Sequence, residues 1–381
     1  MRIVRYYPRA VAGDGGMTGA VRRWSASLAR AGAAVTIVYE GAGEERVVEG
    51  VTWRPLRHAG RGWWKVPVSL DDTLGDADLL VLHSAWVLHN NWAAAGAARR
   101  GLPYLIEPRG AYDPHIVRRR RAVKRAWWAV SERRLVSHAR AIHVFFDEER
   151  EHIRALDYGG AVVVAPNGVE APSGVAWDGG SGGYLLWLGR FDPEHKGLDL
   201  LLHAVESLPV GERPVLRLHG PDYYDGTGGG KDAVRALVRR LGLASAVTIG
   251  DPVHGAQKWD LLARAAGFVY PSRWEAFGNS VGEAVSIGVP TLVTPYPLGR
   301  YLASRGGAVL AEANSAALAT GLRALGASGV GEIARTGARI VATDMTWSGV
   351  ARSWLSQVET LLCITPPRPT AAHFGSPSFS G

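Results

Sequence analysis

Two glutamates eight positions apart, Glu275 and Glu283, enclose the stretch EAFGNSVGE. A strand-like run precedes it, so Glu275 is expected in a strand–helix loop and Glu283 in the first turn of the helix. Gly278 or Asn279 would be the N-cap. The first helical N–H groups could hold a diphosphate, while the carboxylates accept sugar or ribose hydroxyls or stabilise developing positive charge. The alternative is a helix start whose acidic residues only complement the helix dipole.

Two further loops carry groups that suit a diphosphate. Arg190 and Lys196 stand six apart in LGRFDPEHKG, directly after an expected strand. A guanidinium offers a bidentate fork and an ammonium a point charge. The loop GDGGMTG, with Gly15 and Gly16, follows the first expected strand and opens a helix, where backbone N–H groups could hold an anion. It is neither a GxGxxG nor a Walker A motif, and for both loops ordinary solvated surface is the alternative.

The elements that position these loops alternate between strands and helices, which predicts parallel sheets covered by helices on both faces. In such sheets ligands bind at the carboxyl ends of the strands, and two facing domains leave a cleft for them. A Gly/Ser/Asp-rich break at 174–183 separates two such series. We expect domains at 1–172 and 183–346, a helix at 347–362 that packs back towards the first domain, and a disordered tail at 364–381. Strands are expected at 2–7, 34–40, 77–84, 102–108, 139–146, 161–169, 184–190 and 214–221, and helices at 91–101, 198–208 and 232–243.

The composition of the 381 residues fits a cytoplasmic protein with enough apolar residues to form hydrophobic cores. Apolar residues make up 47% and charged residues 20%. No apolar run is long enough for a transmembrane helix, and the first residues lack the apolar stretch of a signal peptide. The single cysteine, Cys363, excludes an internal disulfide and a cysteine-based metal site. The net charge of +8 favours anionic partners such as nucleotides, sugar phosphates, membrane surfaces or nucleic acid.

Together these stretches resemble the retaining glycosyltransferases of the GT-B fold, family 4, over nearly all of residues 1–362. EAFGNSVGEAVSIGVP resembles the E-x7-E signature, and LGRFDPEHKG resembles the G-R-x(n)-K-G segment. GGMTGAVRR resembles the N-terminal Gly-Gly loop and helix, and APNGV the segment that closes the first domain. The resemblance implies an α/β GT-B fold of two facing Rossmann-like doubly wound domains with an interdomain cleft. The first domain would bind the acceptor and the second a nucleotide sugar.

The resemblance also implies roles for individual residues. Arg190 and Lys196 would neutralise the diphosphate of a nucleoside diphosphate sugar, Glu283 would bind its ribose, and Glu275 would steady the donor sugar. The sugar would pass through an oxocarbenium-like state, with the leaving phosphate accepting the acceptor's proton, so that configuration is retained. No metal and no cofactor beyond the donor substrate are expected. The remaining donor-binding residues implied are Gly15, Gly16, Asp251, Ala276, Phe277, Gly278 and Asn279.

Several positions depart from the family pattern. Arg109 in IEPRG stands where many members carry a histidine that contacts the donor, and it could supply charge at that catalytic position. His83 and His115 are candidates for acceptor contact, against the alternatives of a capping and a surface histidine. Phe146 in HVFFDEE replaces a small polar residue, with no consequence that the sequence reveals.

The densest charge run, RRRRAVKRAWW from Arg118 to Trp128, has three interpretations. It could attract an anionic bilayer for peripheral membrane contact with a lipid-linked acceptor, bind an anionic acceptor sugar, or form a solvated helix face. EPRGAYDP and this run resemble a subgroup active in polysaccharide and glycoconjugate assembly, and a glycosylated natural product is a further possible product class.

Two rival classes remain open at this point. A nucleotide-sugar epimerase would use the same fold with a different set of carboxylates and histidines. A basic nucleic-acid-binding protein would fit the charge, although the sequence holds no helix-turn-helix, RRM or zinc pattern. A dinucleotide dehydrogenase is disfavoured by the missing GxGxxG.

Overall fold

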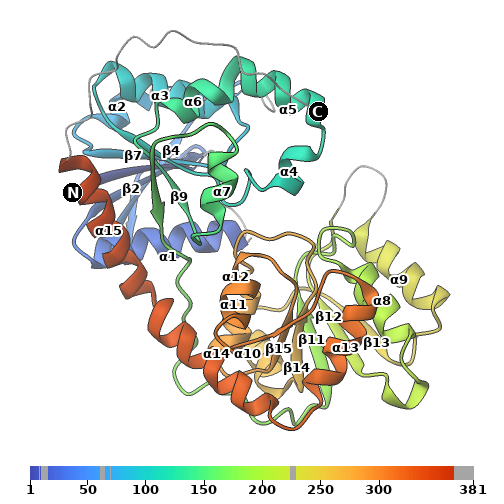
Figure 1. The fold of residues 1–381 in the computed structure, drawn as a ribbon. Coiled ribbons are helices and arrows are strands. Elements are labelled where there is room, and N and C mark those ends of the chain that lie inside the picture. Colours follow the sequence, from blue (N-terminus) through green and yellow to red (C-terminus); the bar gives the residue numbers. More distant parts are fainter. Residues whose placement is uncertain (8, 10–15, 61–64, 69, 224–228, 364–381) are drawn as a thin grey trace.

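Two mostly parallel sheets form the architecture of the computed structural model, which describes residues 1–7, 9, 16–60, 65–68, 70–223 and 229–363 (Figure 1). Expected site residue Gly15 and the expected tail at 364–381 lie outside these residues. The first sheet has the order β10 (Ala161–Val164), β9 (Ala141–Val144), β8 (Tyr104–Glu107), β7 (Leu79–His83), β1 (Arg2–Tyr7), β2 (Ala34–Glu40), β4 (Val51–Leu56) and β3 (Arg46–Val48). The second has the order β13 (Val247–Gly250), β12 (Val215–His219), β11 (Tyr184–Leu188), β14 (Gly267–Tyr270), β15 (Thr291–Val293) and β16 (Val309–Leu310).

The central strands are apolar because helices cover both faces of each sheet. β7 (LLVLH), β11 (YLLWL) and β14 (GFVY) are buried along their whole length, as in doubly wound folds. The α/β fold class predicted from the alternation is therefore confirmed. The first domain's helices are α1 (Gly16–Arg30), α2 (Leu70–Leu74), α3 (Leu88–Arg99), α4 (Pro114–Arg118), α5 (Arg121–Trp127), the π-helical turn η2 (Trp128–Glu132), α6 (Arg133–Ser137) and α7 (Glu149–Arg154). Those of the second are α8 (Leu198–Glu206), the turn η3 (Val210–Glu212), α9 (Gly230–Arg240), α10 (Gly255–Arg264), α11 (Asn279–Ser286), α12 (Pro297–Ala303), α13 (Ser315–Leu325) and α14 (Val330–Asp344).

The edge of the first sheet differs from the expected pattern. β3 pairs antiparallel with β4, and a short antiparallel pair, β5 (His58–Ala59) with β6 (Val66–Pro67), follows. Arg54 and Pro55 interrupt the apolar alternation of β4, and β3 is exposed throughout. Edge strands of this composition give little periodic signal, which is why the sequence did not predict them.

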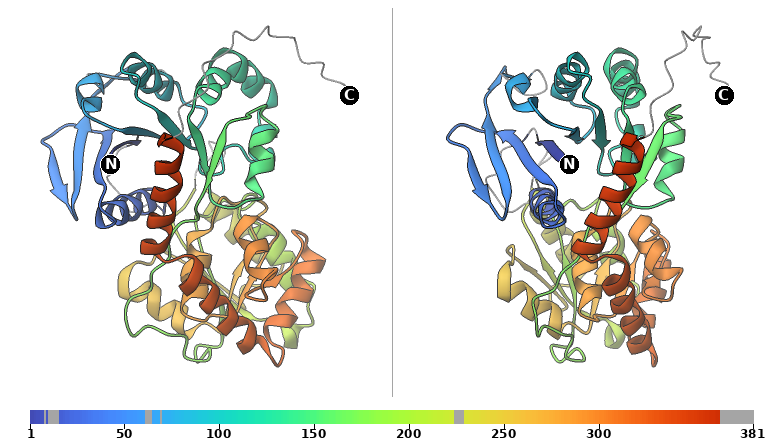
Figure 2. Two further views of the ribbon diagram at one scale, coloured as in Figure 1. Left: turned by 60° about the vertical axis from the view of Figure 1, so that its left-hand side comes forward. Right: turned by 90° about the vertical axis from the view of Figure 1, so that its left-hand side faces the viewer.

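The last helix, α15 (Trp347–Cys363), returns from the second domain and lies along the first, as Figure 2 shows. Trp347 and Trp354 pack against Trp24 of α1, with ring centroids 5.8 and 6.4 Å apart. The amide of Gln357 exchanges two hydrogen bonds with the backbone of Val164, at 3.1 and 3.0 Å. α15 therefore completes the core of the first domain. In the part of the chain that the structure describes, no helix is long and apolar enough to cross a membrane.

Candidate active site between the two domains

The stretch between Glu275 and Glu283 forms the loop after β14 and the first turns of α11. Gly278 is the N-cap, and its φ of 82° lies in the left-handed region that favours glycine. No side chain caps the helix. The first N–H groups of α11 are thus left without a side-chain acceptor, which suits an anion at this end of the helix.

Lys196, at the end of the loop after β11, lies against the start of this stretch. Its Nζ pairs with Glu275 Oε2 and donates a hydrogen bond to the Tyr270 hydroxyl at 3.0 Å. Tyr270 in turn donates to the same carboxylate oxygen at 3.1 Å. The three side chains form a triangle that fixes Lys196 and Glu275 side by side.

The triangle keeps both charges in place. Burial, the largest single effect, would raise the pKa of Glu275, but the Lys196 charge, His195 and the hydrogen bonds from Lys196 and Tyr270 together outweigh it, and the pKa is lowered. Burial would likewise lower the pKa of Lys196, yet the Glu275 carboxylate and Tyr270 raise it above its usual value. Both groups are therefore ionised near neutral pH, and a buried ammonium is present where a phosphate would be held.

Gly197 determines the position of Lys196. It is the N-cap of α8 with a φ of 63°, and a Cβ at this position would overlap the carbonyl oxygen of Pro271. The loop after β11 therefore touches the backbone that follows β14. That close approach brings Lys196 and Glu275 together although 79 positions separate them.

The other expected cation, Arg190, is exposed at the mouth of the same loop. Its guanidinium lies over the ring of Tyr223, 4.4 Å from the centroid. The buried Lys231 at the start of α9 donates to Asp251 Oδ1 at 3.0 Å and lies near the Phe191 ring. The structure thus adds Lys231 to the positive groups on this side, while Asp251 remains exposed beside it.

Glu283 lies one helical turn into α11, and its side chain is only 12% exposed. Lys258 of α10 donates to its Oε1 at 2.7 Å, and Arg23 of α1 lies 3.9 Å from the same atom. The carboxylate is held between the two domains. Its second oxygen has no hydrogen-bond partner among the described residues, so the group can accept a hydroxyl.

Asn279 links the domains directly. Its Nδ2 donates to the carbonyl of Gly16, the first residue of α1, at 3.2 Å. Its Oδ1 accepts from Asn167 at 3.0 Å, and Asn167 accepts from Trp24 Nε1 at 2.8 Å. The Gly16 loop and the α11 N-terminus, both expected to face the donor, are therefore adjacent.

A stack of three rings lies beside Glu275. Trp274 stacks on His195 with centroids 4.6 Å apart and on His115 of the first domain at 6.0 Å. His195 Nε2 bonds the Trp274 carbonyl at 2.9 Å and lies 3.9 Å from Glu275 Oε2. The His115 side chain is 59% exposed, so its free face borders the site. Neither His195 nor Trp274 was expected from the sequence, because their stacking depends on the juxtaposition of the two loops.

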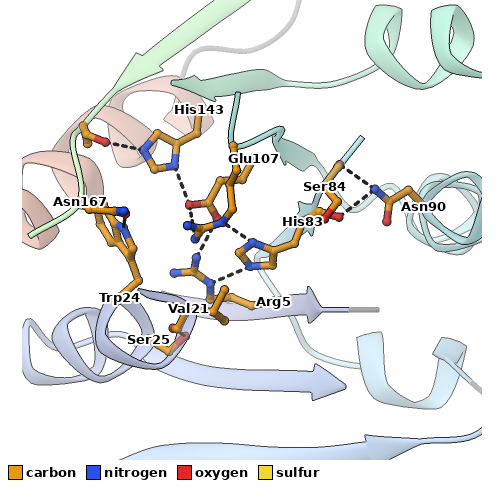
Figure 3. A network of polar contacts seen from close by, with 12 residues as sticks. Arg5, Val21, Trp24, Ser25, His83, Ser84, Asn90, Glu107, His143 and Asn167 are labelled. Atoms are coloured by element: carbon orange, nitrogen blue, oxygen red, sulfur yellow. Dashed lines mark hydrogen bonds and ion pairs between the residues drawn. The ribbon is translucent and has the colours of Figure 1, made fainter. Parts of the chain in front are cut away.

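A buried network under the first domain's side of the site is centred on Glu107 at the end of β8 (Figure 3). Glu107 Oε2 accepts from Arg5 at 2.8 Å and lies 2.9 Å from His83 Nδ1. Its Oε1 accepts from Arg109 at 2.9 Å and lies 3.3 Å from His143 Nδ1. The positive groups, with Arg109 first, hold the pKa of Glu107 well below its usual value against the opposing effect of burial.

The structure thus places two expected site residues inside this network. His83 is fully buried, burial lowers its pKa to about 4, and its Nε2 accepts from Arg5 Nε at 3.2 Å. In this position the His83 imidazole supports Glu107, and it is not exposed to an acceptor substrate. Arg109 has a φ of 52°, and its neighbour Gly110 lies against Ala276 in the loop after β14, residues 271–278. A Cβ on Gly110 would come within 2.7 Å of the Ala276 Cβ. We call this loop the donor loop, because the sequence predicts donor contacts there.

Phe146, which stands where the family pattern has a small polar residue, makes contacts that a small polar residue could not. Its ring stacks on Phe277 of the donor loop with centroids 6.0 Å apart, and Phe145 meets the same ring edge-on at 5.8 Å. Phe146 also contacts Tyr301 of α12 at 5.2 Å. We call Phe145, Phe146, Phe277 and Tyr301 the aromatic interdomain contact, and it ties the first domain to the E-x7-E loop.

We expect Phe146→Ser to lower the free energy of unfolding by about 3 kcal/mol, because a buried aromatic side chain is removed from this contact. Phe146→Leu, which keeps most of the apolar volume, should cost less than about 1.5 kcal/mol. Urea unfolding of the two variants measures both values. A loss below about 1 kcal/mol for Phe146→Ser would show that the contact contributes little.

Glu149 beneath these rings gives the molecule a pH dependence. Its Oε1 accepts from the backbone N–H groups of Phe145 and Phe146 at 2.8 and 3.0 Å. Burial raises the pKa to about 8, only partly offset by these two bonds. The folded state therefore keeps a proton that the unfolded state loses, so this stabilisation is full below about pH 4.3 and is lost as the pH rises to about 8.

We expect Glu149→Gln to flatten the fall of stability between pH 5 and 8, by up to about 1.4 kcal/mol per pH unit. The carboxamide oxygen can keep both backbone hydrogen bonds. Urea unfolding at four pH values measures the slope, with Glu151→Gln on the exposed face of α7 as the control. Equal slopes in wild type and Glu149→Gln would contradict the assignment.

Comparisons with known proteins agree with this fold. Residues 15–168 match the family Glycosyl transferase 4-like domain, and residues 182–327 match Glycosyl transferases group 1. Sucrose-phosphate synthase from Thermosynechococcus elongatus superposes with a TM-score of 0.74 at 17% identity, covering 94% of this chain and 98% of the other. Anabaena HepE, solved with UDP and glucose, gives 0.71 at 16% identity, covering 94% and 100%. AviGT4, a glycosyltransferase involved in avilamycin A biosynthesis, gives 0.59 at 20% identity, covering 95% and 98%. No curated protein sequence matches significantly.

Proposed function

Because the chain belongs to the group 1 glycosyltransferases, we propose that it transfers a sugar from a nucleoside diphosphate sugar to a hydroxyl acceptor with retention of configuration. The observation that carries the proposal is the Lys196–Glu275 pair beside the uncapped start of α11. At this one place the Lys196 ammonium and the helix N-terminus could bind a diphosphate, and the Glu275 carboxylate could bind a sugar. HepE, a structural neighbour, was solved with UDP-glucose.

The donor would lie along the stretch from Glu283 to Glu275. Glu283 would accept the ribose hydroxyls, and the N–H groups at the start of α11 would meet the diphosphate. Arg190 and Lys196 would neutralise its charge. Asp251, at the carboxyl end of β13, would border the base. The backbone from Ala276 to Asn279 would hold the sugar end, with Phe277 fixed by the aromatic interdomain contact and Gly278 providing the turn.

In this proposal the chemical work is electrostatic. As the glycosidic bond breaks, negative charge develops on the leaving phosphate, where the Lys196 ammonium and the α11 dipole stabilise it. Glu275 steadies the sugar as it gains positive charge. The acceptor hydroxyl attacks from the face that the phosphate leaves, and a phosphate oxygen takes its proton. In this proposal the protein charges stabilise the leaving group without a metal ion.

The test is a transfer assay with UDP-, GDP-, dTDP- and ADP-sugars, followed by NMR of the anomeric proton in the product or hydrolysed sugar. We expect release of one nucleoside diphosphate and a first-formed product with the configuration of the donor. No release with any donor, or an inverted first product, would contradict the proposal.

We further propose that the protein works in the cytoplasm and meets the inner face of the membrane through α4–α6, in polysaccharide, glycolipid or natural-product assembly. Arg118, Arg119, Arg120 and Arg121 are exposed, as are Val123 and Val130, 66% and 84%. Arginines with exposed apolar side chains suit an anionic bilayer. Lys124 instead turns inward to the Ile116 carbonyl and the Trp86 ring, and Trp128 packs on Trp86.

Co-sedimentation with vesicles tests this surface. We expect binding to phosphatidylglycerol vesicles but not to phosphatidylcholine vesicles, and a loss of binding in Val130→Asp. Equal recovery with both lipids, or unchanged binding by the variant, would assign the arginines to a solvated face or to an anionic acceptor.

A further inference from the structure

The buried network around Glu107 carries more positive than negative charge. Arg5 is 2% exposed, the Arg109 side chain 6%, and Glu107 1%. His83 is neutral near pH 7, because burial lowers its pKa to about 4. Two guanidinium groups therefore face one carboxylate. No second carboxylate contacts these groups among the described residues.

Arg109 is the charged member of this network with a buried N–H group that lacks an acceptor among the described residues. Both oxygens of Glu107 already have two neighbours each, and Arg109 reaches one of them through Nη2 alone. Its Nε is buried without a hydrogen-bond partner in the described chain. A buried guanidinium N–H without an acceptor is unfavourable, and arginine binds carboxylates best through two parallel hydrogen bonds. Its buried Nε therefore lacks the acceptor that a further planar anion would supply.

The position of Arg109 identifies which part of a substrate would bring that anion. Gly110 lies against Ala276, and the Arg109 guanidinium lies 5.9 Å from the centroid of Phe145, which meets Phe277. Arg109 is thus at the Glu275 end of the donor loop. The α11 N-terminus, proposed for the diphosphate, begins three residues after Ala276, and Glu283 lies a further turn away.

The backbone around this position is also unusual. Ser84 and Trp86 after β7, and Arg109 after β8, all have φ between 52° and 70° although none is glycine. Left-handed conformations at non-glycine residues carry strain and cluster at functional sites. Three of them at the carboxyl ends of two adjacent strands agree with a substrate site there.

We propose that Arg109 binds a carboxylate carried by a sugar substrate, so that the enzyme uses a hexuronic acid either as the transferred sugar or as the acceptor. This rests on the proposed glycosyltransferase function. A carboxylate beside Arg109 supplies the missing negative charge and an acceptor for its unpaired Nε–H. The neutral hexose, with a hydroxymethyl group at the same carbon, supplies neither.

The first experiment measures donor binding by calorimetry with two matched pairs, UDP-glucuronate against UDP-glucose and GDP-mannuronate against GDP-mannose. A second arm measures binding of methyl glucuronide against methyl glucoside to the protein saturated with the nucleoside diphosphate. In one arm we expect the carboxylate form to bind about tenfold more tightly, as for a hydrogen bond to a charged group. The arm that shows the preference identifies the substrate that carries the carboxylate.

Variants separate this role from a structural one. Arg109→Gln should abolish the preference without weakening the binding of the nucleoside diphosphate alone, and Arg109→Lys should keep part of it. Arg339→Gln, an exposed arginine on α14, controls for net charge. Equal binding of both members of every pair, or a preference that survives in Arg109→Gln, would overturn the inference. Weaker diphosphate binding by Arg109→Gln would instead assign Arg109 to phosphate, and no nucleotide binding at all would overturn the proposed function itself.

Discussion

Replacing Lys196 with methionine is expected to lower kcat by about 10²–10³-fold, because the ammonium that stabilises the leaving phosphate is removed from a buried site. Nucleotide affinity should fall as well, since the same charge contacts the diphosphate in the bound state. Steady-state release of nucleoside diphosphate from the preferred donor measures both effects.

The same change leaves Glu275 without its counter-charge, so a loss of stability must be separated from a loss of catalysis. In the double variant Lys196→Met/Glu275→Gln the uncompensated carboxylate is gone, and stability should recover while activity does not. Recovery of activity in the double variant would show that Lys196 serves only to neutralise Glu275. An unchanged kcat in Lys196→Met alone would remove the lysine from the mechanism.

Gly197→Ala is expected to lower the free energy of unfolding by about 2–5 kcal/mol. A left-handed alanine costs about 1–2 kcal/mol, and the overlap with the Pro271 carbonyl forces an overpacking cost of about 1–3 kcal/mol more. Because the backbone must shift where Lys196 is positioned, activity should fall with stability.

Gly242→Ala is the matched control. Gly242 has a φ of 64°, almost that of Gly197, but open space surrounds the added Cβ. It should therefore show only the conformational cost of about 1–2 kcal/mol. Equal destabilisation of the two variants in urea unfolding would show that the contact with Pro271 is unimportant.

The sequence was sufficient for the fold class because its central strands are short, apolar and buried on both faces. β7, β11 and β14 each end in a loop that carries polar or charged residues. Their parallel arrangement forces those loops to one edge, so Lys196 and Glu275 could be placed in one site from their positions in the pattern alone. Their direct ion pair with Tyr270 needed the structure.

What the sequence could not reveal depends on contacts between distant segments. Arg5 lies in the middle of β1 and pairs with Glu107, 102 positions later. In sequence it is one of two arginines in an otherwise apolar strand, and nothing indicates that His83 is buried against it. Phe146 could be recognised as a departure, but its partner Phe277 lies in the other domain. The arrangement of the two domains determines these contacts, and no local periodicity encodes it.

The basic run from Arg118 to Trp128 shows a further limit of prediction from sequence. The basic run from 118 to 128 suggests one continuous helix, yet Arg120 has a φ of 53° and separates α4 from α5. The break divides the charges between two short helices. It also brings Arg119 within 5.5 Å of the Trp274 ring centroid in the donor loop.

The most direct test of the central claim is calorimetric binding of UDP, GDP, dTDP and ADP to the wild type and to Glu283→Ala, with Glu332→Ala on the exposed start of α14 as the control. We expect one of the four to bind the wild type, and Glu283→Ala to bind it about tenfold or more weakly, because the ribose loses hydrogen bonds to a largely buried carboxylate. The control should bind like the wild type. Full affinity in Glu283→Ala for the diphosphate that the wild type binds would contradict a nucleotide held between Glu283, the α11 N-terminus and Lys196.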